Sequence, residues 1–186
     1  MVTVGALWAA ILVAAVLVFV MSSIVWMVLP HHKRDWKGLP NEEEVLAALG
    51  DVPPGQYDFP HMASLEELKM PEVKARFEKG PVGFFTVAPK GTPNMAKNLG
   101  IWFVVTLLVS ATIAYVAGRA LPPGTEFLRV FQITGTVAWA AYGFAAVGDA
   151  VWFARPWSSV LKQLLDALLY ALVTAGAFGW LWPDTL

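Results

Sequence analysis

A long uncharged apolar run near the start of the chain constrains its fold more than any other feature. Val4 to Leu29 contains only two polar side chains, those of Ser22 and Ser23, and no charged one. About 20 residues of α-helix cross the roughly 30 Å hydrocarbon core of a bilayer. The run is therefore predicted to be a membrane-spanning helix that Pro30 ends. It lacks a basic leading region and a small-residue cleavage site, which favours an uncleaved anchor over a signal peptide.

Three further apolar runs follow, and short connections join them. The chain is 57% hydrophobic and only 15% charged, whereas soluble domains carry about 25% charge. Short connections make consecutive helices antiparallel neighbours. Ser158 or Ser159 is predicted to cap the last helix. The predicted organisation is a first transmembrane helix at 4–30, a loop domain at 31–97 and a three-helix unit at 98–186 with spans at 98–118, 128–153 and 159–182.

The predicted fold class is an all-α membrane protein of four transmembrane helices, with a mostly helical insert between the first two. Within the insert, Asn41 is predicted to start a helix that runs to about Leu49. Ser64 begins a capping box whose helix is redirected at Pro71 and ends at Gly80. Residues 82–87 are predicted to form a short strand or to lie on the lipid surface. Few apolar positions leave the insert with a weak core.

The distribution of basic residues predicts the orientation. Of the 13 Lys and Arg residues, two lie in the 154–162 turn and two on the opposite side of the membrane. The other nine all lie in the 31–97 loop: Lys33, Arg34, Lys37, Lys69, Lys74, Arg76, Lys79, Lys90 and Lys97. Cytoplasmic loops are enriched in basic residues. The sequence therefore predicts a cytoplasmic loop and two external termini, in what we expect to be a bacterial inner (plasma) membrane.

Several classes of chemistry are excluded or unsupported by the sequence. The chain has no Cys, so it forms no disulfide and no thiolate metal site. A net charge of −1 gives no basic patch for nucleic acid. There is no HExxH, GxSxG, phosphate-binding loop or dinucleotide fingerprint. We therefore predict no catalytic residue and no cofactor. The missing motifs favour a protein without enzymatic activity.

Small residues recur every four positions along two of the predicted spans. Such spacing lets helix backbones approach closely in a membrane. The favoured interpretation is packing inside the chain's own four-helix bundle. The alternative is an interface with protein partners or with a second copy of the chain. The predicted helix-packing residues are Ala167, Ala171, Ala175 and Gly179 on the last span and Ser110, Ala114 and Gly118 on the second.

A group of polar residues lies near the turn between the last two spans. Carboxylates at this depth face protein or water and find partners. The predicted intramembrane polar cluster comprises Asp149, Arg155, Lys162, Asp166 and Tyr170. The favoured interpretation is a set of ion pairs that fixes the helical hairpin. The alternative is a protonatable site, in which two nearby acids raise one pKa and hydroxyls continue a polar track.

The histidines, with Asp35 beside His31 and His32 and with Asp58 near His61, are only weak candidates for metal ligands. His31 and His32 are adjacent, and neighbouring side chains in an irregular segment point in different directions. His61 lies in the loop, far from both in sequence. No ligand spacing typical of a metal site is present. The sequence therefore predicts no metal site.

Three functional hypotheses follow from these patterns. The first is a non-catalytic accessory, scaffold or assembly subunit of a membrane complex. The small size of the chain and the weak hydrophobic core of its insert favour this hypothesis. The alternative is a small oligomeric proton-coupled transporter or channel that uses Asp149 and Asp166. The third is a membrane enzyme that uses the histidines. The predicted partners are the lipid bilayer and other proteins, with no nucleic acid.

Overall fold

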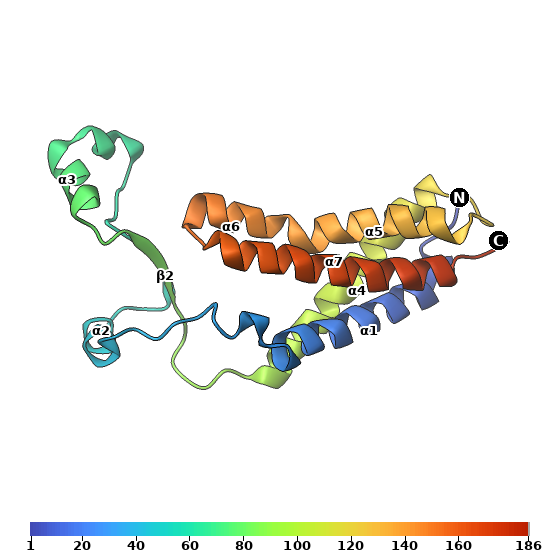
Figure 1. The fold of residues 1–186 in the computed structure, drawn as a ribbon, viewed down its shortest axis with the longest axis horizontal. Helices are drawn as coiled ribbons and strands as arrows, with labels where there is room; N and C mark the ends of the chain where they lie inside the picture. The colour runs from blue at the N-terminus through green and yellow to red at the C-terminus, as the bar shows by residue number, and fades with distance from the viewer. Residues whose placement is uncertain (186) are drawn as a thin grey trace.

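The computed structural model describes residues 1–185 and is mostly helical. Four of its helical segments are long and apolar enough to cross a membrane, which confirms the four predicted spans: Gly5–Val28, Met95–Ala120, Phe127–Phe153 and Trp157–Trp180. Figure 1 shows these segments packed along one long axis, with the start and end of the chain at the same end. The insert extends from the opposite end.

The first span changes helix type near its end. A 3₁₀ turn, η1 (Gly5–Leu7), leads into α1 (Trp8–Ser23) and a π-helical turn, η2 (Ile24–Val28). Leu29 is extended, with φ −74° and ψ 140°, as expected for a residue that precedes proline. Pro30 then begins a 3₁₀ turn, η3 (Pro30–His32). The predicted end of the helix at Pro30 is therefore confirmed to within two residues.

The remaining spans differ from the predicted ones in detail. The second is α4 (Met95–Ala120), which Asn94 caps by accepting a hydrogen bond from the Lys97 backbone N–H at 3.0 Å. The third is two helices, α5 (Phe127–Gly143) and α6 (Ala145–Phe153). Between them the backbone makes a 3₁₀-type turn, in which the Val147 N–H donates to the carbonyl of Phe144, three residues earlier, at 3.2 Å.

The last helix, α7 (Trp157–Trp180), has no serine cap. The prediction of a cap at Ser158 or Ser159 is wrong. Pro156 precedes the helix, and its carbonyl accepts hydrogen bonds from the backbone N–H groups of Ser159 at 2.9 Å and Val160 at 3.2 Å. Pro156 itself has an extended ψ of 130°, so the helix begins only after it.

Close helix contacts form where glycine faces alanine. An added Cβ on Gly135 of α5 would lie 3.1 Å from the Ala175 Cβ, and one on Gly143 would lie 3.0 Å from the Ala167 Cβ. At these positions only an alanine methyl group lies between the backbones of α5 and α7, as small residues allow in membranes.

The seven predicted helix-packing residues all lie at contacts within the chain. Ala167, Ala171, Ala175, Ser110, Ala114 and Gly118 are buried. The Phe127 ring occupies the space beside Gly179, 2.7 Å from where a Cβ would be. The Gly118 carbonyl accepts a hydrogen bond from the Val2 backbone N–H at 3.0 Å. These small faces are used inside the bundle, so a partner protein would need a different surface.

The insert contains a two-stranded antiparallel sheet, here called the hairpin although two short helical elements lie between its strands, and this corrects the all-α prediction. Strand β1 (Gly55–Phe59) pairs with β2 (Gly83–Val87) in antiparallel register, with Gly55 opposite Val87. The strand alternative for 82–87 is thus confirmed. Its partner β1 was not predicted because it is short and alternates polar with aromatic residues directly after the Pro53-Pro54 turn.

The helices of the insert are short. The predicted helix after Asn41 is present as α2 (Glu42–Ala48), although the Asn41 side chain caps no backbone N–H. The capping box at Ser64 produces a 3₁₀ turn, η4 (Leu65–Lys69), rather than an α-helix. The α-helix of this region is α3 (Pro71–Lys79), and it ends as predicted at Gly80, whose φ of 63° suits glycine.

The insert has no buried core. No residue from Lys33 to Asn94 is buried. One aromatic contact joins the hairpin to the bundle: the Phe84 ring meets the Phe153 ring edge-on, with centroids 5.7 Å apart. Figure 1 shows the insert reaching beyond the ends of α6 and α7 along the long axis of the molecule.

Candidate functional site: a histidine–aspartate network

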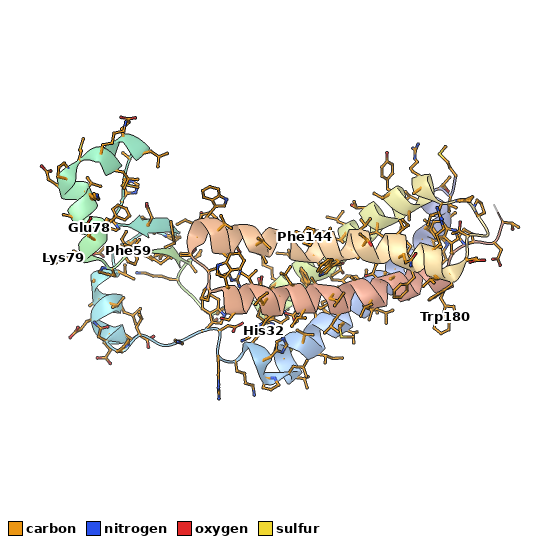
Figure 2. The ribbon with its side chains drawn as sticks, turned by 45° about the horizontal axis from the view of Figure 1, so that its top comes forward. His32, Phe59, Glu78, Lys79, Phe144 and Trp180 are labelled. Carbon is orange, nitrogen blue, oxygen red and sulfur yellow. The ribbon has the colours of Figure 1, made fainter. Side chains whose placement is uncertain are left out.

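Two adjacent histidines converge on one aspartate of α7. The His31 Nε2 lies 3.0 Å from Oδ1 of Asp166, and the His32 Nε2 lies 2.7 Å from Oδ2 of the same carboxylate. Figure 2 labels His32, which belongs to the segment that leaves α1 beside α7. The network therefore joins the first and last spans at the end of the bundle that carries the insert.

The turn at Pro30 explains why both rings face the same way. His31 and His32 lie in a 3₁₀ turn, and from this turn both rings contact Asp166 of α7. Their ring centroids are 4.1 Å apart and the ring planes are tilted by 41°. The expectation that adjacent histidines point in different directions is therefore wrong for this pair, since it assumed an irregular segment.

A second carboxylate holds His32 from the other side. The Asp35 Oδ2 lies 2.7 Å from the His32 Nδ1. Lys162 of α7 donates from Nζ to Asp35 Oδ1 at 2.5 Å and to the His31 carbonyl at 2.6 Å. The hydrogen bond from Lys162, followed by that from His32, lowers the pKa of Asp35. Asp35 is thus held as a carboxylate that fixes the orientation of the His32 ring.

The network is largely shielded from solvent. The side chains of His32 and Asp166 are each 5% exposed, whereas that of His31 is 32% exposed. The Trp26 ring stacks on His32 with centroids 4.0 Å apart and planes 5° from parallel. A buried carboxylate is costly unless it is paired and hydrogen-bonded, and here both Asp166 oxygens have partners.

The predicted polar cluster divides into two groups. Asp149 pairs with Arg155 at 3.1 Å, and Gln163 lies against the same guanidinium. Lys162 and Asp166 belong instead to the histidine network, each with a partner from residues 31–35. The expected contacts between the two acids and Lys162 are replaced by contacts with a segment far away in the sequence.

A small, open cavity lies beside Asp166 between the helices. It has a volume of about 310 Å³, and Arg155, which pairs with Asp149, also borders it, so the cavity adjoins both polar groups. The buried hydroxyls of Tyr142 and Tyr170 have no hydrogen-bond partner. The cavity is lined by Trp26, Trp102, Tyr142, Arg155, Gln163, Asp166 and Tyr170. The polar groups among these residues can bind water or a small polar ligand.

A larger cavity of about 960 Å³ separates the hairpin from the end of the bundle. Asp35 and Arg155 line it from the bundle side, and Tyr57 and Phe84 line it from the hairpin. The outer carboxylate of the network, Asp35, therefore borders a space that is open to solvent.

Three of these groups have the arrangement of a metal-binding set. One possible ligand atom from each of His31, His32 and Asp166 lies within 4.8 Å of the other two. His61, the remaining predicted candidate, lies apart from them: it pairs with Asp58 at 2.7 Å on the insert, with its side chain 73% exposed. The structure thus brings together two of the three candidate histidines.

Sequence reasoning named Asp35 beside His31 and His32 only as a weak metal-ligand candidate and did not predict its contact with His32. Its position three residues after His32 was a usable signal, because residues three apart face each other across one helical turn. The pairing of the histidines with Asp166 had no local signal, since 134 and 135 residues separate the partners.

No family model, no curated protein and no solved structure matches this chain. The site must therefore be interpreted from its own geometry.

Proposed function

We propose that this protein is a non-catalytic accessory or assembly subunit of a membrane complex, which binds a partner protein through the insert between α1 and α4. The observation that carries the proposal is the absence of any buried residue from Lys33 to Asn94. A segment of ordered elements without a core gains stability by burying apolar surface against another molecule.

Apolar side chains are available on the insert for such a contact. Nine large ones are exposed on the insert: Trp36, Leu39, Leu46, Phe59, Leu65, Leu68, Met70, Val82 and Phe84. Interfaces combine apolar anchors with a polar rim. The insert supplies both, because charged residues accompany the exposed leucines on α2 and η4.

A protein partner suits this surface better than lipid. The insert extends along the long axis of the bundle and beyond its end (Figure 1), so it is directed away from the bilayer that the four spans would occupy. The small-residue faces of the spans are already covered within the chain. The insert is therefore the surface that we assign to the partner.

The proposed orientation places the insert in the cytoplasm of a bacterial cell, with both termini outside the inner membrane. It is supported by the nine Lys and Arg residues of the 31–97 loop among 13 in the chain.

Site-specific photo-crosslinking in the native cells tests the proposal. A benzophenone side chain at Leu65, which is 79% exposed on the insert, is expected to give one adduct of defined size. The adduct should disappear in a Leu68→Asp variant and its partner should copurify in fixed ratio. A benzophenone at Leu128, which is 62% exposed on the apolar face of α5, is the matched control and should give no such adduct.

Two outcomes would overturn this assignment. One is an insert that gives no adduct although the protein is folded and membrane-bound. The other is an adduct that survives Leu68→Asp, because that result would show contact without use of the apolar surface.

A second candidate function is proton-coupled transport by a small oligomer that uses Asp149 and Asp166. It is favoured by the 310 Å³ cavity beside Asp166 and by the unpartnered hydroxyls of Tyr142 and Tyr170. Proton flux in proteoliposomes that is lost in Asp166→Asn would support this candidate. Flux that is absent from the wild-type protein would exclude it.

A further inference from the structure

We propose that His31, His32 and Asp166 bind one divalent first-row transition-metal ion, such as Zn²⁺. This inference is independent of the docking role, because it concerns the end of the bundle and not the surface of the insert. Two imidazole nitrogens and one carboxylate are a ligand set that Zn²⁺ and its neighbours favour. Ca²⁺ and Mg²⁺ prefer oxygen ligands and fit the set poorly.

The spacing of the ligand atoms is close to what such an ion requires. Bonds of about 2.0–2.2 Å at the tetrahedral angle place ligand atoms roughly 3.3 Å apart. The two histidine nitrogens lie 3.0 Å and 2.7 Å from the Asp166 oxygens. The nitrogen–oxygen contacts therefore need to open by a few tenths of an ångström, while the three ligand atoms as a set, which lie within 4.8 Å of one another, must close around the ion. Each nitrogen must also give up the proton that it now shares with the carboxylate.

Asp35 supplies a second carboxylate, which would not bind the ion but holds the ring of His32. A ligating imidazole usually donates its other N–H to a carboxylate, which fixes its tautomer. Asp35 occupies this position at 2.7 Å from the His32 Nδ1 and leaves Nε2 to face Asp166. Lys162 in turn holds Asp35 at 2.5 Å, so its positive charge is already paired.

The surroundings provide both shielding and access. His32, on which the Trp26 ring stacks, and Asp166 are both buried, while the 32% exposure of His31 gives the ion a path from solvent. Three protein ligands leave at least one coordination position open. The cavity of about 310 Å³ that Asp166 borders provides room for water at that position.

The test is metal titration of the full-length protein in detergent, purified without a polyhistidine tag and stripped with chelator. We expect one Zn²⁺ or Co²⁺ per chain, and a Co²⁺ absorption spectrum typical of nitrogen and oxygen ligands. His32→Gln and Asp166→Asn should weaken affinity by more than the roughly 10–100-fold that outer partners cost. Asp35→Asn should weaken it within that range.

His61→Gln is the matched control, because it removes a histidine that also pairs with an aspartate at 2.7 Å but lies on the exposed insert. It should leave affinity and stoichiometry unchanged. His31→Gln is the ligand variant least expected to misfold, because the His31 side chain is 32% exposed. It therefore separates loss of a metal ligand from loss of the fold. The proposal is overturned if the folded wild-type protein binds no Zn²⁺, or if one-to-one binding survives His31→Gln and His32→Gln.

Discussion

His32 and Asp166 are 134 residues apart in the chain, yet the His32 Nε2 lies 2.7 Å from the Asp166 Oδ2. This contact fastens the segment that follows α1 to the first half of α7. Because Asp166 also accepts from His31, its carboxylate is the common partner of two side chains. The network therefore links the first and last spans of the bundle.

Asp166→Asn is expected to lower the midpoint of thermal unfolding in detergent. The amide keeps the size of the carboxylate but removes the charge to which both histidines bond. A hydrogen bond to a charged group contributes about 1.5–3 kcal/mol, so a loss of that order is expected.

Asp149→Asn is the matched control for this substitution. The Asp149 side chain is 46% exposed and pairs with Arg155 near the end of the bundle. Exposed ion pairs contribute less than about 1 kcal/mol. A larger loss of stability in Asp149→Asn than in Asp166→Asn would contradict the structural importance given to the histidine network.

Gly143→Ala is expected to destabilise the contact between α5 and α7. The new Cβ would lie 3.0 Å from the Ala167 Cβ and 3.2 Å from the Leu164 Cδ2, which is tighter than normal packing. Overpacking of this kind costs about 1–3 kcal/mol. A lower unfolding midpoint measures the effect, and the double variant Gly143→Ala, Ala167→Gly should recover most of it.

Gly176→Ala on α7 is the control, because no atom lies within 4 Å of the added Cβ. It should cause no loss of stability. If both glycine variants behave alike, or if Ala167→Gly brings no recovery, close packing at Gly143 is not what holds these helices together.

The sequence predicts the four spans because a bilayer imposes a length and a composition that local residues satisfy on their own. Val4 to Leu29 is long and apolar enough to cross wherever it lies in the fold. Local residues also determine α2, which begins directly after Asn41 as predicted. Hydropathy carries less information on where such helices break, as at Phe144 between α5 and α6.

Only part of the candidate site could be predicted from the sequence, because the site depends on contacts between distant segments. Asp166 and Lys162 were identified as polar groups that need partners within the membrane. Their partners, however, come from residues 31–35, and hydropathy carries no information on that pairing. Strand β1 was missed for a similar reason, because Gly55–Phe59 becomes a strand only through its pairing with β2.

Phe85→Ala is expected to open the β-hairpin without affecting the bundle. The Phe85 ring packs against Tyr57 and Phe59, with centroids 5.2 Å and 5.9 Å apart. Aromatic pairs contribute about 0.5–1.5 kcal/mol each, and the insert has no buried core to compensate for their loss. Hydrogen exchange of the β1 amides should therefore become faster, while the unfolding midpoint of the bundle stays unchanged.

Phe84→Ala provides the comparison for the hairpin, because Phe84 lies on the opposite face of β2 and contacts Phe153 of α6. It should leave exchange within β1 unchanged and loosen only the attachment of the hairpin to the bundle. Equal protection of β1 in the wild-type protein and in Phe85→Ala would show that backbone pairing alone maintains the hairpin.

Single-cysteine labelling is expected to place the insert inside the cell and the α4–α5 turn outside. The chain has no Cys, so Glu43→Cys and Thr125→Cys each introduce one thiol without a background signal. The excess of basic residues in the 31–97 loop favours its retention in the cytoplasm. A membrane-impermeant maleimide should therefore label Thr125→Cys on intact cells, and Glu43→Cys only after permeabilisation. The reverse pattern would contradict the orientation but not the four spans, since it exchanges the two sides of the membrane for the same helices.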